Sequence, residues 1–155
     1  MSYILNETDI AKSETPDVMR HFYDEMKRYD SVATKTNVEL SDHLILSVMN
    51  PSQIAPPDFW IIGRKAQSRL LFGNQWADNI RKTQHTPIKK HNLASPAGYL
   101  YSLVNGLHYD VISISDPNMQ GAIRRLIVPM KDRPDGNYLF FATLIHYEEF
   151  LRKAD

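Results

Sequence analysis

The six histidines are the residues whose spacing is easiest to test for chemistry. They are His21, His43, His85, His91, His108 and His146. None of them forms the H-x₃-H or H-E-x-x-H pattern that brings two imidazoles onto one helix face as zinc ligands. His85 and His91 share a polar stretch without periodicity, which is a poor scaffold for preorganised ligands. We therefore expect no metal site.

The sequence also lacks cysteine nucleophiles and the common motifs of nucleophilic serines and phosphate-binding loops. The chain has no cysteine, so thiolate nucleophiles, disulfides and Cys-bound metals are excluded. It has no G-x-S-x-G nucleophile elbow, no G-x-x-x-x-G-K-[ST] and no G-x-G-x-x-G. We expect no catalytic residues and a non-enzymatic protein.

Arg124 and Arg125 are the charged pair that most needs an explanation. In an extended segment they point to opposite sides, so one should face a covered side and the other solvent. Arg124 shares its side with the apolar Leu126 and Val128. A semi-buried guanidinium needs an anion, which is either an internal carboxylate or an acidic ligand.

Composition narrows the class of protein. The 155 residues fit one domain, and 18 Lys plus Arg balance 18 Asp plus Glu, a zero net charge that disfavours nucleic-acid binding. The basic residues at 81–82 and 89–90 have no aromatic residues between them on which bases could stack. We therefore expect them to lie on the solvent-exposed surface without binding nucleic acid. No apolar run reaches the roughly 18 residues of a membrane span. The first residues lack a secretory pattern, so we expect a cytoplasmic protein without membrane contact.

The N-terminal part reads as a loose arm over residues 1–14 and an amphipathic helix from Thr15. Its apolar stripe, at helical spacing, consists of Val18, Phe22, Met26 and Tyr29. Such a stripe packs either on the core of its own domain or on a second copy. We take it as the candidate dimer contact and expect a homodimer.

Short elements follow. Residues 43–49 and 58–63 read as strands, and residues 65–72 as a helix that Gly73 closes. A further helical turn over 74–80 carries Trp76. Ser95-Pro96 opens the clearest helix, with one apolar face of Leu100, Leu103, Val104 and Leu107.

In the last third of the chain, the spacing of apolar residues changes from the helical period of 3.6 residues to the strand period of 2. Residues 108–115, 122–130 and 138–147 read as three strands joined by turn sequences, and residues from 148 as a polar, helix-compatible tail. The strand at 138–147 is apolar on both sides, so both faces should be covered. We expect an α+β fold with helices on one face of an antiparallel sheet. The divisions are an arm and helix at 1–36, a domain at 37–150 and a tail at 151–155.

This order resembles a divergent bacterial PAS-like domain. The segments that carry the likeness are HLILSVMN at 43–50, FWIIG at 59–63, LLFGNQWA at 70–77, PAGYLYSLVNGL at 96–107, RRLIVPM at 124–130 and LFFATLIHY at 139–147. The resemblance implies a five-stranded antiparallel sheet with short helices on one face, here with an extra N-terminal helix. It also implies a sensory or regulatory module in signal transduction.

A ligand pocket between the sheet and the short helices is part of what the resemblance implies. The candidate ligand-binding residues are Trp60, Arg64, Trp76, Tyr101 and Arg124. The ligand would be a small organic molecule. A cysteinyl-adduct flavin is excluded without Cys, and haem is not expected because residues 96–106 contain no histidine.

Two other classes stay open. One is a small pocket-bearing α+β enzyme, such as a cone-shaped-barrel isomerase, with Tyr101, His108 and Asp110 as suspects. The other is a ligand-free adaptor that binds only a signalling partner protein. A strongly curved sheet of four or six strands would favour the enzyme, and a filled core would favour the adaptor.

Overall fold

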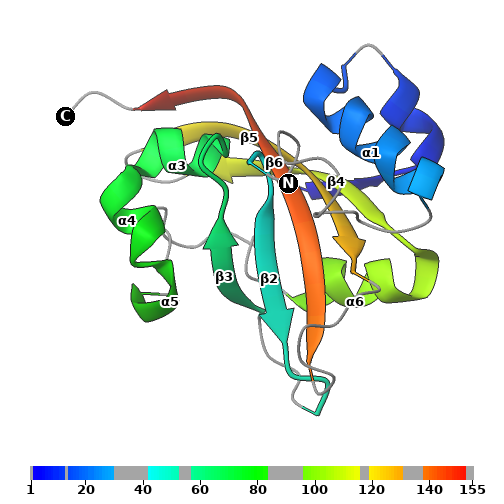
Figure 1. The fold of residues 1–155 in the computed structure, drawn as a ribbon. Coiled ribbons are helices and arrows are strands. Elements are labelled where there is room, and N and C mark those ends of the chain that lie inside the picture. Colours follow the sequence, from blue (N-terminus) through cyan, green and yellow to red (C-terminus); the bar gives the residue numbers. More distant parts are fainter. Residues whose placement is uncertain are drawn as a thin grey trace.

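Six strands and six helices form the described part of the chain (Figure 1). The computed structural model describes residues 2–12, 14–29, 42–52, 57–83, 96–115, 119–130 and 138–152. The strands are β1 (Ser2–Leu5), β2 (Ile45–Met49), β3 (Asp58–Ile62), β4 (His108–Ser115), β5 (Met119–Pro129) and β6 (Leu139–Arg152). The helices are the 3-10 helix η1 (Glu7–Ala11) and α1 (Asp17–Tyr29), α3 (Gln67–Phe72), α4 (Asn74–Asp78), α5 (Ile80–Thr83) and α6 (Pro96–Asn105).

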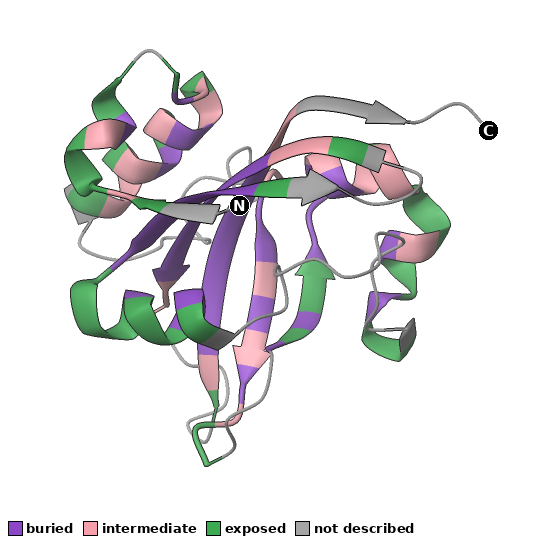
Figure 2. Ribbon diagram, turned by 180° about the vertical axis from the view of Figure 1, so that it is seen from behind, coloured by how far each residue is buried: buried purple, intermediate pink, exposed green. Residues whose placement is uncertain are grey.

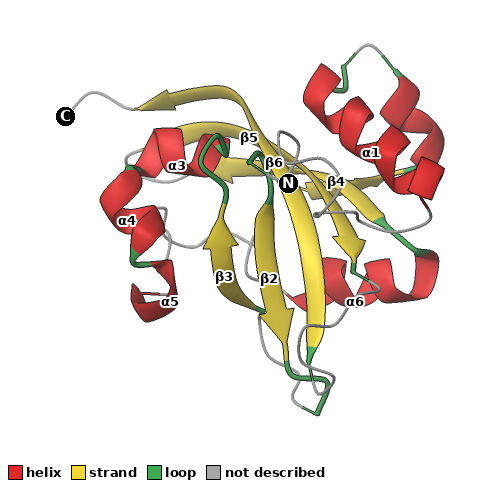
Figure 3. Cartoon of the chain, in the orientation of Figure 1, coloured by secondary structure: helices red, strands yellow, loops and turns green. Residues whose placement is uncertain are grey.

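The strands form one antiparallel sheet in the order β1-β4-β5-β6-β2-β3. The expected meander of β4, β5 and β6 is confirmed, and so is the pair β2–β3. The expected loose arm is wrong, because residues 2–5 pair with β4 and make a sixth strand. The expected helical tail is also wrong, because β6 continues as a strand to Arg152 (Figure 3). The expected boundary between residues 36 and 37 lies outside the described residues.

Both faces of the sheet are covered. We call the side that carries Ile123, Ile127, Phe141 and Ile145 face A, and the side that carries Tyr109, Leu126 and Leu144 face B. On face A, Ala66 before α3 and the helices α3, α4 and α5 form one cluster with the sheet, and α6 adds Tyr99 to another; the helical members of the first cluster are Leu71, Phe72, Trp76, Ala77 and Ile80. On face B, η1 and α1 contribute Ile10, Val18, Met19, Phe22, Tyr23 and Met26. Because successive side chains of a strand point to opposite faces, the two clusters of face A are separated from the cluster of face B.

The helix α6 turns an unexpected side toward the sheet. The residues it buries are Gly98, Tyr99 and Ser102, whereas Leu100, Leu103 and Val104 are exposed. In Figure 2 most of α6 therefore carries the colour of exposed residues. A Cβ on Gly98 would lie 2.8 Å from Arg125 Nη2 and 2.9 Å from His108 Cδ2. Glycine lets the helix backbone approach polar side chains of the sheet, so the close contact sets the rotation of α6.

Candidate functional site

Two hydroxyl groups on face A are completely buried without a hydrogen-bond partner. Ser47 lies on β2 and Thr143 on the adjacent β6, where Thr143 is opposite Ile45 and Ser47 is opposite Phe141. Both residues have 0% exposure, and neither Ser47 Oγ nor Thr143 Oγ1 has a partner within the described part of the chain. A buried hydroxyl without a partner is costly, so each such group needs an explanation.

Tyr99 of α6 brings a third hydroxyl to these two. Burial raises the pKa of Tyr99, while the charge of Arg125 and the hydroxyls of Ser47 and Thr143 act in the opposite direction. Its ring packs edge-on against Phe141 at a centroid distance of 5.2 Å. The three hydroxyls therefore belong to one polar spot beneath α6, and the Tyr99 phenol stays protonated at neutral pH.

Aromatic rings also pack on the neighbouring part of face A, in a core cluster separate from that of Tyr99 and Phe141. Phe72 and Trp76 of the short helices lie edge-to-face at 5.1 Å, and Phe72 packs in the same way on Tyr147 of β6 at 6.0 Å. Phe59 of β3 belongs to the same core cluster. A few polar groups within an apolar and aromatic lining are typical of small-molecule sites.

Arg125 and Asp110 carry the charges on face A, and they neutralise each other. Arg125 Nε and Nη2 donate to the two Asp110 oxygens at 2.8 and 2.9 Å. Asp110 Oδ2 also lies 3.0 Å from His108 Nε2. Burial raises the pKa of Asp110, but hydrogen bonds from His108 and Arg125, with their charges, hold that pKa below its ordinary value.

Arg124 lies on face B, away from the hydroxyls. It forms an ion pair with Glu148 and donates to the Tyr109 hydroxyl at 2.7 Å. The Tyr109 hydroxyl is 2.7 Å from Thr15 Oγ1, which donates to the Asp9 carbonyl at 3.1 Å. Of the two anion sources considered for Arg124, the structure places the internal carboxylate beside it. The expectation that one of the two arginines faces solvent is wrong, since both are buried because both faces are covered.

Trp60 lies at the exposed edge of the sheet. It is the extra residue where the β2–β3 register shifts, between the pairs Leu46–Ile61 and Ser47–Phe59. Its ring packs edge-on against Phe140 at 6.1 Å. The Arg81 guanidinium stacks on it at 4.1 Å, while Arg81 Nε donates to the Trp60 carbonyl. Arg81 thereby shields the edge strand.

The other candidates are divided between separate places. Arg64 is exposed and pairs with Asp42 at 3.2 Å, beside a 390 Å³ groove floored by Leu44 and Leu46. Trp76 is half-buried on face A, and Tyr101 is exposed with its ring 5.2 Å from that of His108. The five predicted residues therefore do not form one site.

Sequence reasoning missed Ser47, Thr143 and Tyr99. A usable signal was present, because Ser47 interrupts the apolar run HLILSVM and Thr143 interrupts YLFFATLIHY. A polar residue in a strand that is covered on both faces must either find a partner or be available to a ligand.

The stripe of α1 packs on its own sheet. Phe22 is 1% exposed, and the half-buried Val18 and Met26 join the same face B cluster. Tyr29 ends the helix, but its side chain is outside the described residues. The packing is that of the own-core alternative, and dimerisation stays a prediction.

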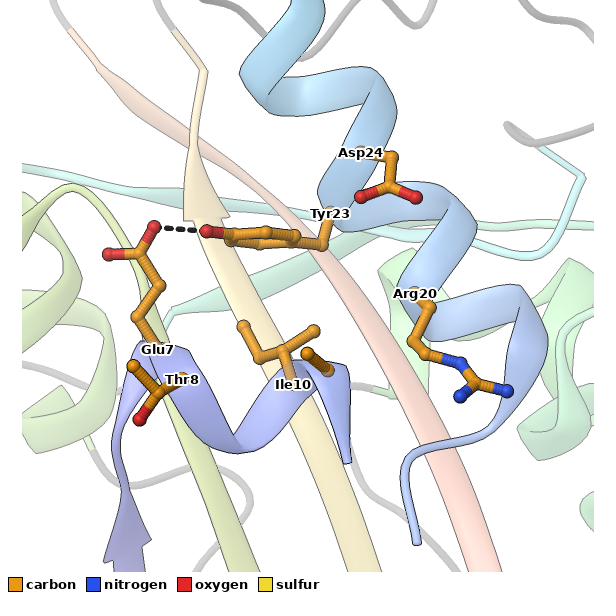
Figure 4. Close-up of a pocket in the computed structure, with 7 residues that line it drawn as sticks. Glu7, Thr8, Ile10, Arg20, Tyr23 and Asp24 are labelled. Atoms are coloured by element: carbon orange, nitrogen blue, oxygen red, sulfur yellow. Dashed lines mark hydrogen bonds between the residues drawn. The ribbon is translucent and has the colours of Figure 1, made fainter. Parts of the chain in front are cut away.

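A second cavity, of about 470 Å³, lies between η1 and α1 (Figure 4). Three of its polar lining residues have partners: the Tyr23 hydroxyl donates to Glu7, Glu7 also lies 2.6 Å from Lys27 Nζ, and Arg20 pairs with Asp17. The hydrogen bonds from Lys27 and from the Tyr23 hydroxyl lower the pKa of Glu7. We interpret these contacts as structural, because they hold η1 and α1 together.

Comparison of the chain with protein-family models, with curated proteins and with solved structures gives no match in any of the three. Within the described ranges, no three His, Asp or Glu side chains gather as a metal site. The same residues include no helix that is both long and apolar enough to span a membrane.

Proposed function

We propose that this protein is a non-enzymatic, PAS-like sensory or regulatory domain of the cytoplasm that binds a small organic molecule between face A and helices α3 to α6. The observation that carries the proposal is the pair of fully buried, unpartnered hydroxyls of Ser47 and Thr143. A ligand that hydrogen-bonds to both would remove their desolvation penalty in the bound state.

The order of elements supports this proposal. Two strands, three short helices, one longer helix and a three-stranded meander follow one another, and β6 pairs with β2. The strand β1 is an addition at the far edge, beside β4. Fold alone does not dictate function, so the proposal depends on the hydroxyl site.

Hydrogen bonds connect the ligand region to the rest of the sheet. Ser68 Oγ of α3 is 2.7 Å from the Tyr147 hydroxyl, and Gln67 Oε1 accepts from the Tyr147 backbone N–H at 2.7 Å. On the opposite face, Tyr109 connects β4 to the segment that precedes α1 through Thr15. A ligand that favours one position of α3 would therefore change the relative populations of the conformations of the sheet. Because α1 packs on the same sheet, the change would also affect α1.

Native mass spectrometry tests the proposal. The purified protein should show a mass excess that disappears on denaturation. The double variant Ser47→Ala/Thr143→Val should lose this excess, since both hydroxyls are removed with little change in volume. Ser102→Ala is the matched control, because Ser102 is equally buried but donates to the Tyr99 carbonyl at 2.6 Å within α6. A wild-type protein without a mass excess would favour the ligand-free adaptor.

The sheet has six strands, one of the two strand numbers named for the enzyme, and a second observation also favours the enzyme as a second candidate. Its three suspects lie together, with His108 between Asp110 and the ring of Tyr101. However, Asp110 is committed to Arg125, and His108 is 4% exposed beneath Gly98. A group buried in this way is poorly placed to meet a substrate. We therefore rank this candidate second.

A further inference from the structure

We infer that the ligand of face A is an uncharged molecule with an aromatic or aliphatic body and one hydroxyl, carbonyl or amide group. This inference rests on the proposed function and specifies the class of its ligand. Its basis is the difference between the two kinds of polar group on face A. The Arg125–Asp110 ion pair is saturated, whereas the hydroxyls of Ser47 and Thr143, and also His108 Nδ1, have no hydrogen-bond partner among the described residues.

The ion pair has no capacity left for a charged ligand. Asp110 accepts both hydrogen bonds from Arg125 and a third contact from His108. A carboxylate ligand would have to displace Asp110 from Arg125 and leave a buried anion without its cation. An ammonium ligand would have to displace Arg125. Both exchanges uncover a charge at side chains that are only 4% and 7% exposed, which is strongly unfavourable.

The hydroxyls have the opposite property. Each can donate one hydrogen bond and accept others without carrying a charge. Since burial raises the pKa of Tyr99, its phenol remains a donor over the physiological range. Neutral donors on the adjacent strands β2 and β6, with the Tyr99 hydroxyl of α6 beside them, suit a neutral oxygen of a ligand. The rings of Phe59, opposite Ser47 on β3, and of Phe141, which packs on Tyr99, provide apolar contacts for its body.

Three near-isosteric probes separate charge from shape: benzamide, benzoate and benzylammonium. At equal millimolar concentration and neutral pH, benzamide should raise the melting temperature of the protein, and its affinity should exceed those of the two ions by about tenfold or more. The response to benzamide should disappear in Ser47→Ala/Thr143→Val and persist in Ser102→Ala. In Asp110→Asn, which releases Arg125 from its anion, benzoate should gain a response.

The molecule that accounts for the native mass excess provides a second readout. After extraction it should carry no formal charge at neutral pH. A charged extracted molecule, or benzoate binding to the wild type as tightly as benzamide, would overturn the neutral-ligand inference and leave the binding function intact. If there is no mass excess and none of the probes stabilises the protein, the proposed function fails, and this inference fails with it.

Discussion

Arg125 and Asp110 lie directly opposite each other on β5 and β4 and make a two-point contact at 2.8 and 2.9 Å. Their neighbours Arg124 and Tyr109 form a second polar contact on the other side of the same sheet. Two consecutive arginines are thus buried on opposite faces, each with its own partners. Within the described residues, three buried polar atoms of the sheet strands on face A then have no hydrogen-bond partner: the hydroxyls of Ser47 and Thr143 and the Nδ1 atom of His108.

Removal of one partner of the Arg125–Asp110 pair should be strongly destabilising. Asp110→Asn leaves a buried guanidinium without its anion, for which we expect a loss of about 3–5 kcal/mol in the free energy of unfolding. The double variant Asp110→Leu/Arg125→Met should recover most of that loss, because no charge is left uncompensated. Urea unfolding of the three proteins measures both effects. A double variant as unstable as Asp110→Asn would contradict the pairing.

Gly98 should not tolerate a side chain. Gly98→Ala would gain about 1 kcal/mol of helix propensity. Its Cβ would lie 2.8 Å from Arg125 Nη2, and we expect the resulting shift of α6 to cost about 1–3 kcal/mol and to outweigh that gain. Val104→Ala is the control in the same helix, because Val104 is 85% exposed, and its effect should stay within about 0.5 kcal/mol. Thermal unfolding distinguishes the two. A stabilised Gly98→Ala protein would refute the close approach of α6.

His146 should make the contact between α3 and β6 sensitive to pH. The Tyr147 backbone N–H donates to Gln67 Oε1, so the Gln67 amide nitrogen must be the group that faces His146 Nδ1 at 3.0 Å. Nδ1 therefore accepts a hydrogen bond, and the imidazole is neutral. Burial lowers the pKa of His146, Glu148 opposes this change, and Arg124 adds to it.

The sign of the pH effect follows from that pKa. Because the folded protein binds the His146 proton less readily than the unfolded chain, stability is greatest above the unfolded value of about 6.5. It falls as the pH decreases from there toward the lower pKa of the folded state. Melting temperatures measured between neutral pH and about pH 5 should decrease less in His146→Gln than in the wild type. Parallel curves for the two proteins would contradict this role of His146.

The Tyr109 hydroxyl should contribute more to the free energy of unfolding than the Tyr147 hydroxyl does. It accepts from Arg124 and contacts Thr15, so Tyr109→Phe leaves two buried groups short of a partner, at a cost of about 1–3 kcal/mol. Tyr147→Phe leaves one buried group, the Ser68 hydroxyl, short of a partner and should cost less, about 1 kcal/mol. Chemical unfolding provides both values. Equal losses would mean that the Tyr109 network does not hold the N-terminal segment on face B.

Most of the fold could be predicted from the sequence, because period and turn chemistry are local properties. The meander and the β2–β3 pair follow from alternation, and Gly73 and Gly106 adopt positive φ angles at the ends of α3 and α6. The strand at residues 2–5 was missed because a short edge strand depends on its pairing with β4, which is a non-local contact.

The candidate site could be predicted only in outline. Two covered faces were expected, but the partners of Arg124 and Arg125 depend on the register between β5 and its neighbours β4 and β6, which the alternation of residues does not fix. The apolar stripe of α6 suggested which side packs on the sheet, and the contact at Gly98 reverses that choice. Unpartnered hydroxyls become visible only when burial and geometry are known for each atom.

The central claim is that the hydroxyls of Ser47 and Thr143 are available to a ligand and are not needed by the fold. The most direct test is the free energy of unfolding of Ser47→Ala and Ser102→Ala in protein refolded from urea after removal of small molecules. Ser47→Ala should be as stable as the wild type or up to about 1 kcal/mol more stable, because it removes an unpartnered buried hydroxyl. Ser102→Ala should lose about 1 kcal/mol with its hydrogen bond to Tyr99. If Ser47→Ala destabilises the ligand-free protein as much as Ser102→Ala does, the Ser47 hydroxyl serves the fold, and the account is contradicted.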